Sequence, residues 1–183
     1  MNDFFEQTQA RYTAILERLD RDIRSFSDAQ IHWKADANTW SIAEALQHII
    51  TADTAYLEPM HRALQGAERT ASPVAYRPSF FARLFIYSLR PGRFRYKAPA
   101  VFKPESSRIS HTIRQNFADH IRTQMQALQA WRSYDINRLK MTSPANAMVR
   151  ISLGEALDVM ITHTERHMAQ VDRILQHPQF PTL

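Results

Sequence analysis

The sequence predicts an all-α protein built as a four-helix bundle, with one short additional helix inserted between the second and third long helices. Three observations support this prediction. Only three glycines occur in 183 residues, too few for a sheet-rich fold with many tight turns. Four long segments repeat apolar residues at steps of three and four. Two of these segments begin with a capping box, a serine followed three residues later by a glutamate. We expect one domain over residues 1–183.

The predicted helices have recognisable start and stop signals. Their expected bounds are residues 3–26, 41–65, 79–89, 105–134 and 152–176. The second helix begins at the capping box Ser41-Ile42-Ala43-Glu44 and ends at Gly66, and the last begins at the capping box Ser152-Leu153-Gly154-Glu155. Ser27-Asp28 and residues 34–38 carry loop chemistry. The long link between the second and third long helices permits a crossover connection in place of simple up-and-down order.

Composition and missing segments exclude several classes of protein. The chain contains no cysteine, which rules out disulfides, thiolate metal sites and a catalytic cysteine. Its first residues are acidic and lack the basic and apolar regions of a signal peptide. No apolar run reaches the roughly 18–20 residues that a membrane span needs. We therefore expect a cytoplasmic protein without a transmembrane segment.

The net charge of +5 is concentrated in one part of the chain. Residues 77–108 contain eight basic side chains and one acid, Glu105, which gives +7 and leaves −2 for the rest of the chain. Residues 73–104, which we call the basic-aromatic segment, also hold eight of the 19 aromatic residues. The basic residues are Arg77, Arg83, Arg90, Arg93, Arg95, Lys97, Lys103 and Arg108, and the aromatic residues are Tyr76, Phe80, Phe81, Phe85, Tyr87, Phe94, Tyr96 and Phe102.

Four interpretations of the basic-aromatic segment remain open. In the first, the segment is a packed loop region that covers one end of the bundle or a dimer surface. In the others, it is a lid over an anionic substrate, a contact with a membrane surface, or a surface that stacks on single-stranded nucleic acid. Nothing in the chain resembles a groove-reading helix-turn-helix, and the charge lies in one segment rather than along a continuous face. We therefore predict no nucleic-acid partner.

Two histidines near the carboxyl end have the spacing of metal ligands. His163 and His167 lie four residues apart on one predicted helix, so both imidazoles face the same side and can reach one ion at about 2.0–2.1 Å. Glu165 lies between them and points to the other side of the helix, so the pair lacks the general base of an HExxH metalloprotease. The competing interpretation is a chance pair, since the chain has eight histidines.

His48 is the best candidate for a third ligand. It lies among small residues of the second long helix, Ala45, Ala52 and Ala55, which allow a neighbouring helix to approach closely. An imidazole that shares a metal ion with another helix requires such an approach. The competing interpretation is a hydrogen-bonded histidine at a helix interface.

The other five histidines are weaker candidates for a functional role. His61 completes an ExxH spacing, but a di-iron bundle needs two such motifs and no second one occurs. We expect His32 and His177 to be exposed. His111 and His120 fall on the third long helix, where a hydrogen-bonded core role suits His120.

Two stretches resemble the motifs of the DinB/YfiT-like superfamily. The first resembles the second-helix motif and reads Trp40-Ser41-Ile42-Ala43-Glu44-Ala45-Leu46-Gln47-His48-Ile49. The second resembles the carboxyl-terminal motif and runs from Ser152-Leu153-Gly154-Glu155 through His163-Thr164-Glu165-Arg166-His167-Met168-Ala169-Gln170. The resemblance implies a four-helix bundle of up-down-down-up order, a divalent metal ion on His48, His163 and His167, and frequent formation of homodimers. The basic-aromatic segment departs from the family pattern.

The resemblance also implies a function. Several members of that superfamily are thiol-dependent S-transferases or isomerases that use low-molecular-weight thiols such as bacillithiol or mycothiol. A metal-dependent transferase with a small-molecule substrate and a thiol cosubstrate is therefore the expected activity, and the thiolate must arrive on the cosubstrate because the chain has no cysteine. Imidazole ligands suit Zn, Ni, Cu and Fe alike, which leaves the identity of the metal open. The alternative is a non-catalytic, metal-stabilised binding or interaction module.

Overall fold

Four long helices form the bundle in the computed structural model of the chain. The structure describes residues 3–72, 74–92, 94, 98–99, 102–105 and 109–181. The long helices are α1 (Phe4–Ile23), α3 (Ile42–Leu64), α5 (Ile113–Trp131) and α6 (Leu153–Leu175). The shorter elements are helices α2 (Asp28–His32) and α4 (Phe80–Leu89) and an antiparallel hairpin of β1 (Lys140–Ser143) with β2 (Asn146–Ser152). The all-α prediction is confirmed, with one small hairpin added.

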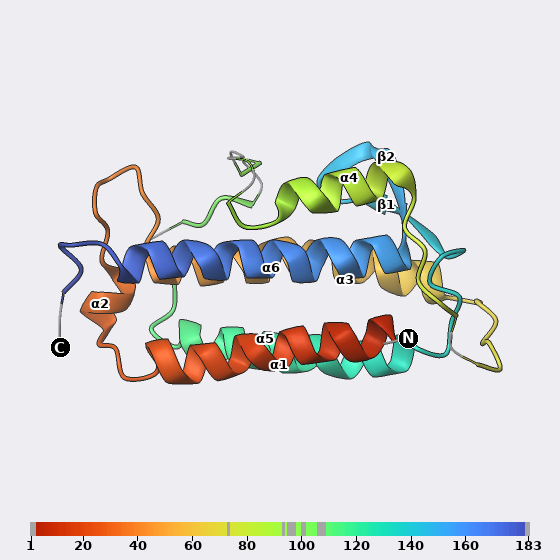
Figure 1. Cartoon of the computed structure of the whole chain (residues 1–183), viewed down its shortest axis with the longest axis horizontal. Helices are drawn as coiled ribbons and strands as arrows, with labels where there is room; N and C mark the ends of the chain where they lie inside the picture. Colours follow the sequence, from red (N-terminus) through yellow and green to blue (C-terminus); the bar gives the residue numbers. More distant parts are fainter. Residues whose placement is uncertain are drawn as a thin grey trace.

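The long helices follow an up-down-down-up order. Helices α1 and α6 run in one direction, and α3 and α5 run in the other (Figure 1). Helix α3 packs against α6 and α5, and α1 packs against the same two helices. Because α3 and α5 are parallel, the chain between them must return along the bundle, and α4 lies on this return path against α6. The helix order implied by the family resemblance is therefore confirmed.

The predicted apolar stripes form the core of the bundle. On α6 the buried residues repeat at steps of three and four, as one face of a helix requires. They include Leu153, Leu157, Met160, Thr164, Met168 and Val171. Thr164 is compatible with this apolar stripe because its hydroxyl donates a hydrogen bond to the carbonyl of Met160, one turn earlier. The stripe holds α6 against α3 and α1 and so fixes the direction in which its histidines point.

The structure differs from the predicted elements in three places. Residues 28–32 form α2, which was not predicted and which includes Asp28, a residue assigned to a loop, although the Ser27 and Gln30 side chains make the reciprocal capping-box bonds that signal a helix start. Helix α5 begins at Ile113 and not near residue 105, and Thr112 at its start makes no side-chain cap. The hairpin was not predicted because β2 is almost wholly exposed and therefore lacks the alternation of apolar and polar residues that marks a strand.

The basic-aromatic segment contains α4, as predicted. Ser79 caps this helix by accepting a hydrogen bond from the backbone N–H of Ala82. Ile86 and Leu89 are buried, and α4 packs on α6. The segment therefore covers one flank of the bundle rather than one end (Figure 1). Some of its predicted basic, aromatic and proline positions lie outside the described residues, namely Pro73, Arg93, Arg95, Tyr96 and Lys97, as does Arg108 just beyond it.

Glu155 joins the start of α6 to the start of α4. One carboxylate oxygen accepts a hydrogen bond from the backbone N–H of Ser152, which completes the predicted capping box, and the other accepts from the backbone N–H of Ser79. Burial acts to raise the pKa of Glu155, but the hydrogen bonds from Ser152 and Ser79 outweigh it, so the pKa lies below its ordinary value.

Replacing Glu155 with glutamine is expected to lower the free energy of unfolding near pH 7 by about 1–2 kcal/mol, because the amide offers only one acceptor to two N–H groups. Because the pKa of Glu155 is lower in the folded protein, the carboxylate contributes fully to the free energy of unfolding above its unfolded pKa of about 4.3, and this contribution shrinks as the pH falls below that value. Urea unfolding at several pH values should therefore show that the difference in free energy of unfolding between wild type and variant becomes smaller in acid. Glu58→Gln, at an exposed position, is the control. A gap that stays constant with pH would contradict this account.

Candidate metal centre

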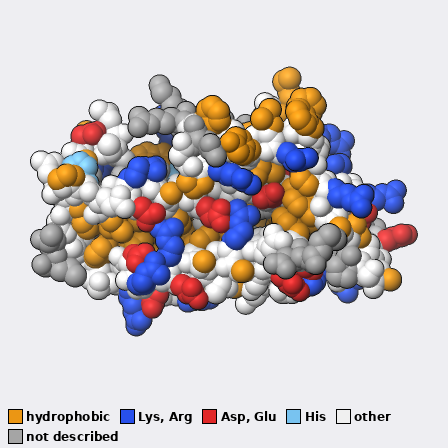
Figure 2. Space-filling view, in the orientation of Figure 1, with side chains coloured by type: hydrophobic (Ala, Val, Ile, Leu, Met, Phe, Trp, Pro, Cys, Tyr) orange, Lys and Arg blue, Asp and Glu red, His pale blue; other side chains and the backbone are white. Residues whose placement is uncertain are grey.

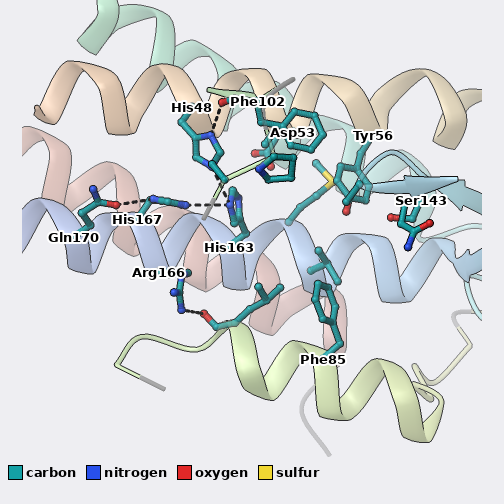
Figure 3. A pocket seen from close by; sticks show the side chains of 18 of the residues that line it. His48, Asp53, Tyr56, Phe85, Phe102, Ser143, His163, Arg166, His167 and Gln170 are labelled. Atoms are coloured by element: carbon teal, nitrogen blue, oxygen red, sulfur yellow. Dashed lines mark hydrogen bonds between the residues drawn. The ribbon is translucent and has the colours of Figure 1, made fainter. Parts of the chain in front are cut away.

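The three predicted ligands come together between α3 and α6. His48 projects from α3, and His163 and His167 project toward it from successive turns of α6 (Figure 3). The Nε2 atom of His163 lies 3.2 Å from Nε2 of His48 and 3.0 Å from Nε2 of His167. Two nitrogens bound to one tetrahedral ion would be separated by roughly 3.4 Å, which is close to these distances. The three histidines are therefore positioned to hold a metal ion.

Hydrogen bonds on the far side of two rings fix which nitrogen faces the shared point. Nδ1–H of His48 donates to the backbone carbonyl of Phe102 at 2.7 Å, and Nδ1–H of His167 donates to Oε1 of Gln170 at 2.9 Å. Both acceptors are oxygens without a proton, so the proton of each neutral ring resides on Nδ1. The Nε2 lone pairs of His48 and His167 are thus left available, as metal coordination requires.

Burial keeps the three rings neutral. His48 and His167 are 2% and 9% exposed, and His163 is half-buried. Burial lowers the pKa of His48. Burial, together with the neighbouring His167, His48 and Arg166, lowers the pKa of His163 well below its ordinary value. Burial, with His48 nearby, lowers the pKa of His167 to about 3. At neutral pH the site therefore presents the deprotonated imidazoles that bind metals.

The set of donors defines which ions fit. Three neutral imidazoles suit Zn, Ni, Cu and Fe, whereas Mg and Ca prefer oxygen ligands. The three rings add no negative charge, so a bound divalent ion would keep its full charge. Structural zinc sites usually have four protein ligands, and catalytic ones three with an open position. The described residues supply three histidines at this point, which is the pattern of a site that also binds an exogenous ligand.

The three histidines line a pocket of about 1100 Å³. Apolar side chains form much of its wall, including Phe81 and Phe85 from α4 and Met160 from α6. Farther along α3 from His48, Asp53 and Tyr56 add polar groups to the lining (Figure 3). A largely apolar pocket with a few convergent polar groups is typical of small-molecule sites.

Arg166 links α6 to the basic-aromatic segment by hydrogen bonds. It lies between His163 and His167 in the sequence, and its guanidinium donates to the backbone carbonyls of Leu89 and Phe94. It also lines the pocket and adds positive charge close to the histidines. The basic-aromatic segment thus forms one wall of the pocket, since Phe102 supplies both a lining side chain and the carbonyl that orients His48.

The remaining predicted residues lie as follows. Glu165 accepts hydrogen bonds from Arg11 of α1 at 2.7 Å, which confirms the prediction that it points away from the histidines. His120 is hydrogen-bonded to the buried Asp53 at 3.2 Å, as a core role predicted. His32, His61 and His111 are exposed. His177 was expected to be exposed, but it is half-buried with its ring 5.2 Å from that of Trp33.

Sequence reasoning missed the groups that orient the ligands. Gln170 could have been found, because it lies three residues after His167 and therefore on the same face of the helix. The carbonyl of Phe102 had no sequence signal, since it is a backbone group 54 residues away from His48. Trp40 was named only as the first residue of the stretch that resembles the family's second-helix motif, yet its ring packs 4.8 Å from the His48 ring and is stacked 5.8 Å from the His167 ring.

The position of Trp40 makes it a reporter of metal binding. Addition of Cu²⁺ or Ni²⁺ is expected to quench tryptophan fluorescence in a saturable way near one equivalent, because a paramagnetic ion between the histidines lies close to the Trp40 ring. Trp40→Phe should remove most of this response, while Trp33→Phe, which leaves Trp40 in place, should retain it. Equal quenching in the Trp40→Phe protein would place the metal elsewhere.

Comparisons with known proteins identify a family. A family model described as the DinB superfamily matches residues 5–171, a range that includes all three histidines and almost all of the four long helices. Searches of curated proteins and of solved structures returned no significant match. Among the described residues, no helix combines the length and the apolar character needed to cross a membrane.

Proposed function

The chain belongs to the DinB superfamily, and from this membership and the geometry of the three histidines we propose that it is a divalent-metal-dependent enzyme acting on a small molecule. His48, His163 and His167 hold the ion in this proposal. The observation that carries it is the convergence of their three Nε2 atoms at the wall of a pocket of about 1100 Å³. The favoured reaction is the transfer of a group involving a low-molecular-weight thiol.

The open side of the site favours catalysis over a purely structural role. A structural ion would be enclosed by protein ligands, whereas these rings line a pocket large enough for a substrate. When bound, the ion would lower the pKa of a thiol or water in its open position towards neutrality and so supply a nucleophile. The carbonyl of Phe102 and the amide of Gln170 orient the rings, which preorganises the site before any ligand arrives.

The lining of the pocket supports an electrophilic cosubstrate with an apolar part. Phe85, Met160 and Ala52 offer contact with hydrocarbon or aromatic groups. Arg166, beside His163, favours a substrate that carries or develops negative charge near the ion. The thiol must be exogenous because the chain contains no cysteine.

Elemental analysis of protein made without a histidine tag tests the metal site. We expect about one divalent ion per chain in the wild type and almost none in His167→Ala, because a site that loses one of its three ligands binds the ion far more weakly. Equal metal contents in the two proteins would overturn the proposed ligand set.

Thiol consumption tests the reaction. Metal-loaded wild type should consume a low-molecular-weight thiol in the presence of one or more members of a panel of small electrophiles. Metal-stripped protein and His163→Ala should lose the activity by a factor of about 100 or more. A protein that binds one ion but turns over no member of a broad thiol and electrophile panel would instead support a non-catalytic metal-stabilised module.

A further inference from the structure

The exposed apolar surface of the described chain is concentrated in one place. Eight large hydrophobic side chains are exposed in the part of the chain that the structure describes, and all of them lie on α4, shortly after it, or on β2. They are Phe80, Phe81, Leu84, Phe85, Tyr87, Phe94, Met148 and Val149. Three are exposed almost completely, Phe80 at 73%, Phe81 at 80% and Met148 at 91%. Isolated exposed hydrophobic residues need no explanation, but a gathering of this kind marks an interaction surface.

These side chains share one side of the molecule. Helix α4 and strand β2 both pack on α6, and both contribute to the lining of the pocket. Figure 1 places α4 and the hairpin together along one edge of the bundle, opposite the layer of α1 and α5. Figure 2 shows hydrophobic side chains projecting from this edge with Lys and Arg side chains beside them. We call this surface, with its basic rim, the α4–hairpin face.

The charge of the α4–hairpin face has a single sign. Residues 74–104 and 140–152 contain no aspartate or glutamate, although the chain has 18 acidic residues. Exposed basic side chains surround the apolar ones in both segments. Those that the structure describes are Arg77, Arg83, Arg90, Lys103, Lys140 and Arg150. Aromatic and aliphatic side chains that project from a surface with only basic neighbours are typical of proteins that bind anionic membranes at the interface.

We propose that the α4–hairpin face docks the protein on an anionic lipid surface. Phe80, Leu84 and Tyr87 lie at positions i, i+4 and i+7 of α4 and so project together from the side of the helix opposite the buried Ile86 and Leu89, and the exposed Phe81 flanks them. Their rings and methyl groups enter the boundary between headgroups and acyl chains. The arginines around them stay at the level of the headgroups and bind lipid phosphates, with their aliphatic stems along the apolar layer.

The charge pattern disfavours a second copy of the chain as the occupant. A symmetric dimer through this face would place the same basic residues of both copies opposite one another, with no acid in either segment to compensate. Single-stranded nucleic acid also matches the surface less well than lipid. Leu84, Met148 and Val149 are aliphatic and cannot stack on bases, whereas they insert readily among acyl chains.

The docking face borders the entrance of the pocket. Phe81, Phe85 and Val149 belong both to the exposed apolar set and to the lining of the pocket, and Arg150 of the basic rim lines it too. A protein docked in this way therefore turns one wall of its pocket toward the lipid. The inference does not depend on the metal or on the proposed reaction, since it rests only on the surface.

Vesicle flotation of the full chain tests the proposal. Wild type should float with phosphatidylcholine vesicles that contain about 30% phosphatidylglycerol and should bind pure phosphatidylcholine at least about tenfold more weakly. Binding should weaken as the salt concentration rises from about 0.05 M to about 0.5 M. It should be the same for metal-loaded and metal-stripped protein, which separates this proposal from the metal-dependent function.

Two pairs of variants locate the surface. Phe81→Ser with Leu84→Ser should reduce vesicle binding by about tenfold or more while thermal unfolding stays close to wild type, because both side chains are exposed. Arg83→Glu with Arg150→Glu should cause a similar loss on anionic vesicles. The charge-matched control is Arg24→Glu with Arg122→Glu, at exposed positions in the layer of α1 and α5, and it should bind like wild type.

Other results would overturn the inference. The lipid surface would be ruled out as the occupant if wild type does not float at low salt. It would also be ruled out if Arg83→Glu with Arg150→Glu binds vesicles as well as the control Arg24→Glu with Arg122→Glu. A wild type that is dimeric by light scattering and becomes monomeric in Phe81→Ser with Leu84→Ser, without vesicle binding, would show that a second copy covers the face. Tight binding to a single-stranded oligonucleotide, lost in the same variant while vesicles fail to bind, would assign the face to nucleic acid.

Discussion

Replacing His163 with alanine is expected to leave the metal-free protein about as stable as wild type and to abolish the stabilisation that a divalent metal gives. The His163 ring is half-buried and faces the pocket, so removing it leaves little new cavity. Without an ion, its Nε2–H can donate to the Nε2 lone pair of His48 or of His167, and one such neutral hydrogen bond contributes only about 1 kcal/mol. With metal at about 1,000 times the dissociation constant, wild type gains about 4 kcal/mol by mass action.

Thermal unfolding with and without added Zn²⁺ or Ni²⁺, after removal of bound metal, measures this difference. His61→Ala, at an exposed position in the same helix as His48, is the control and should respond to metal as wild type does. A structural histidine cluster without a metal would behave differently. In that case His163→Ala would destabilise the protein equally in both conditions, and no metal-dependent gain would appear in the wild type.

Gln170→Ala is expected to weaken metal binding by about 10–100-fold without removing a ligand. The amide oxygen of Gln170 accepts the Nδ1 proton of His167 and so holds that ring in the orientation and tautomer that expose Nε2. Without this acceptor the ring can rotate or protonate at Nε2, and both changes compete with the ion. Gln170→Glu keeps an acceptor at the same position and should preserve the affinity or raise it.

Competition titration against a chromophoric chelator measures the affinities of the two variants and of wild type. Gln129→Ala, at an exposed position on α5, is the matched control for loss of a glutamine side chain. We expect the metal affinity of Gln170→Glu to equal or exceed that of wild type, and the metal affinity of Gln170→Ala to be lower than both. If Gln170→Glu and Gln170→Ala lose the same affinity, then Gln170 acts through packing and not as a hydrogen-bond acceptor.

Helix positions were predictable from local patterns. The capping boxes at Ser41 and Ser152 fixed the starts of α3 and α6 to within a residue, and Gly66, with φ of +71°, follows the end of α3 as expected. Where no capping residue marked the start of a helix, the predicted start was misplaced. Helix α5 has no side-chain cap at its start, so Ile109 and its neighbours from residue 105 onward were assigned to it wrongly. The up-down-down-up order came from the family resemblance, because periodicity alone does not give helix direction.

The site was predictable to the extent that it depends on helix geometry. Spacing placed His163 and His167 on one face, and the small residues around His48 indicated a close helix contact. Alternation and spacing say nothing about backbone groups that arrive from a distant segment, so the carbonyl of Phe102 could not be foreseen. The outward face of α4 was equally hidden, since the sequence showed that the helix is apolar but not which of its side chains α6 would cover.

His48 and His163 are separated by 115 residues, and α6 follows the other three long helices in the chain. While the protein is being synthesised, His48 therefore has no partner ligands until at least 115 further residues have been made. A metal ion held by these three histidines would therefore not nucleate folding as it does in small zinc-dependent domains. Packing of the finished bundle must come first, and the hydrogen bonds to Phe102 and Gln170 then present a ready-made set of nitrogens for loading. Metal acquisition should accordingly be a late step, and the supply of ions in the compartment where folding ends would decide which metal the protein carries.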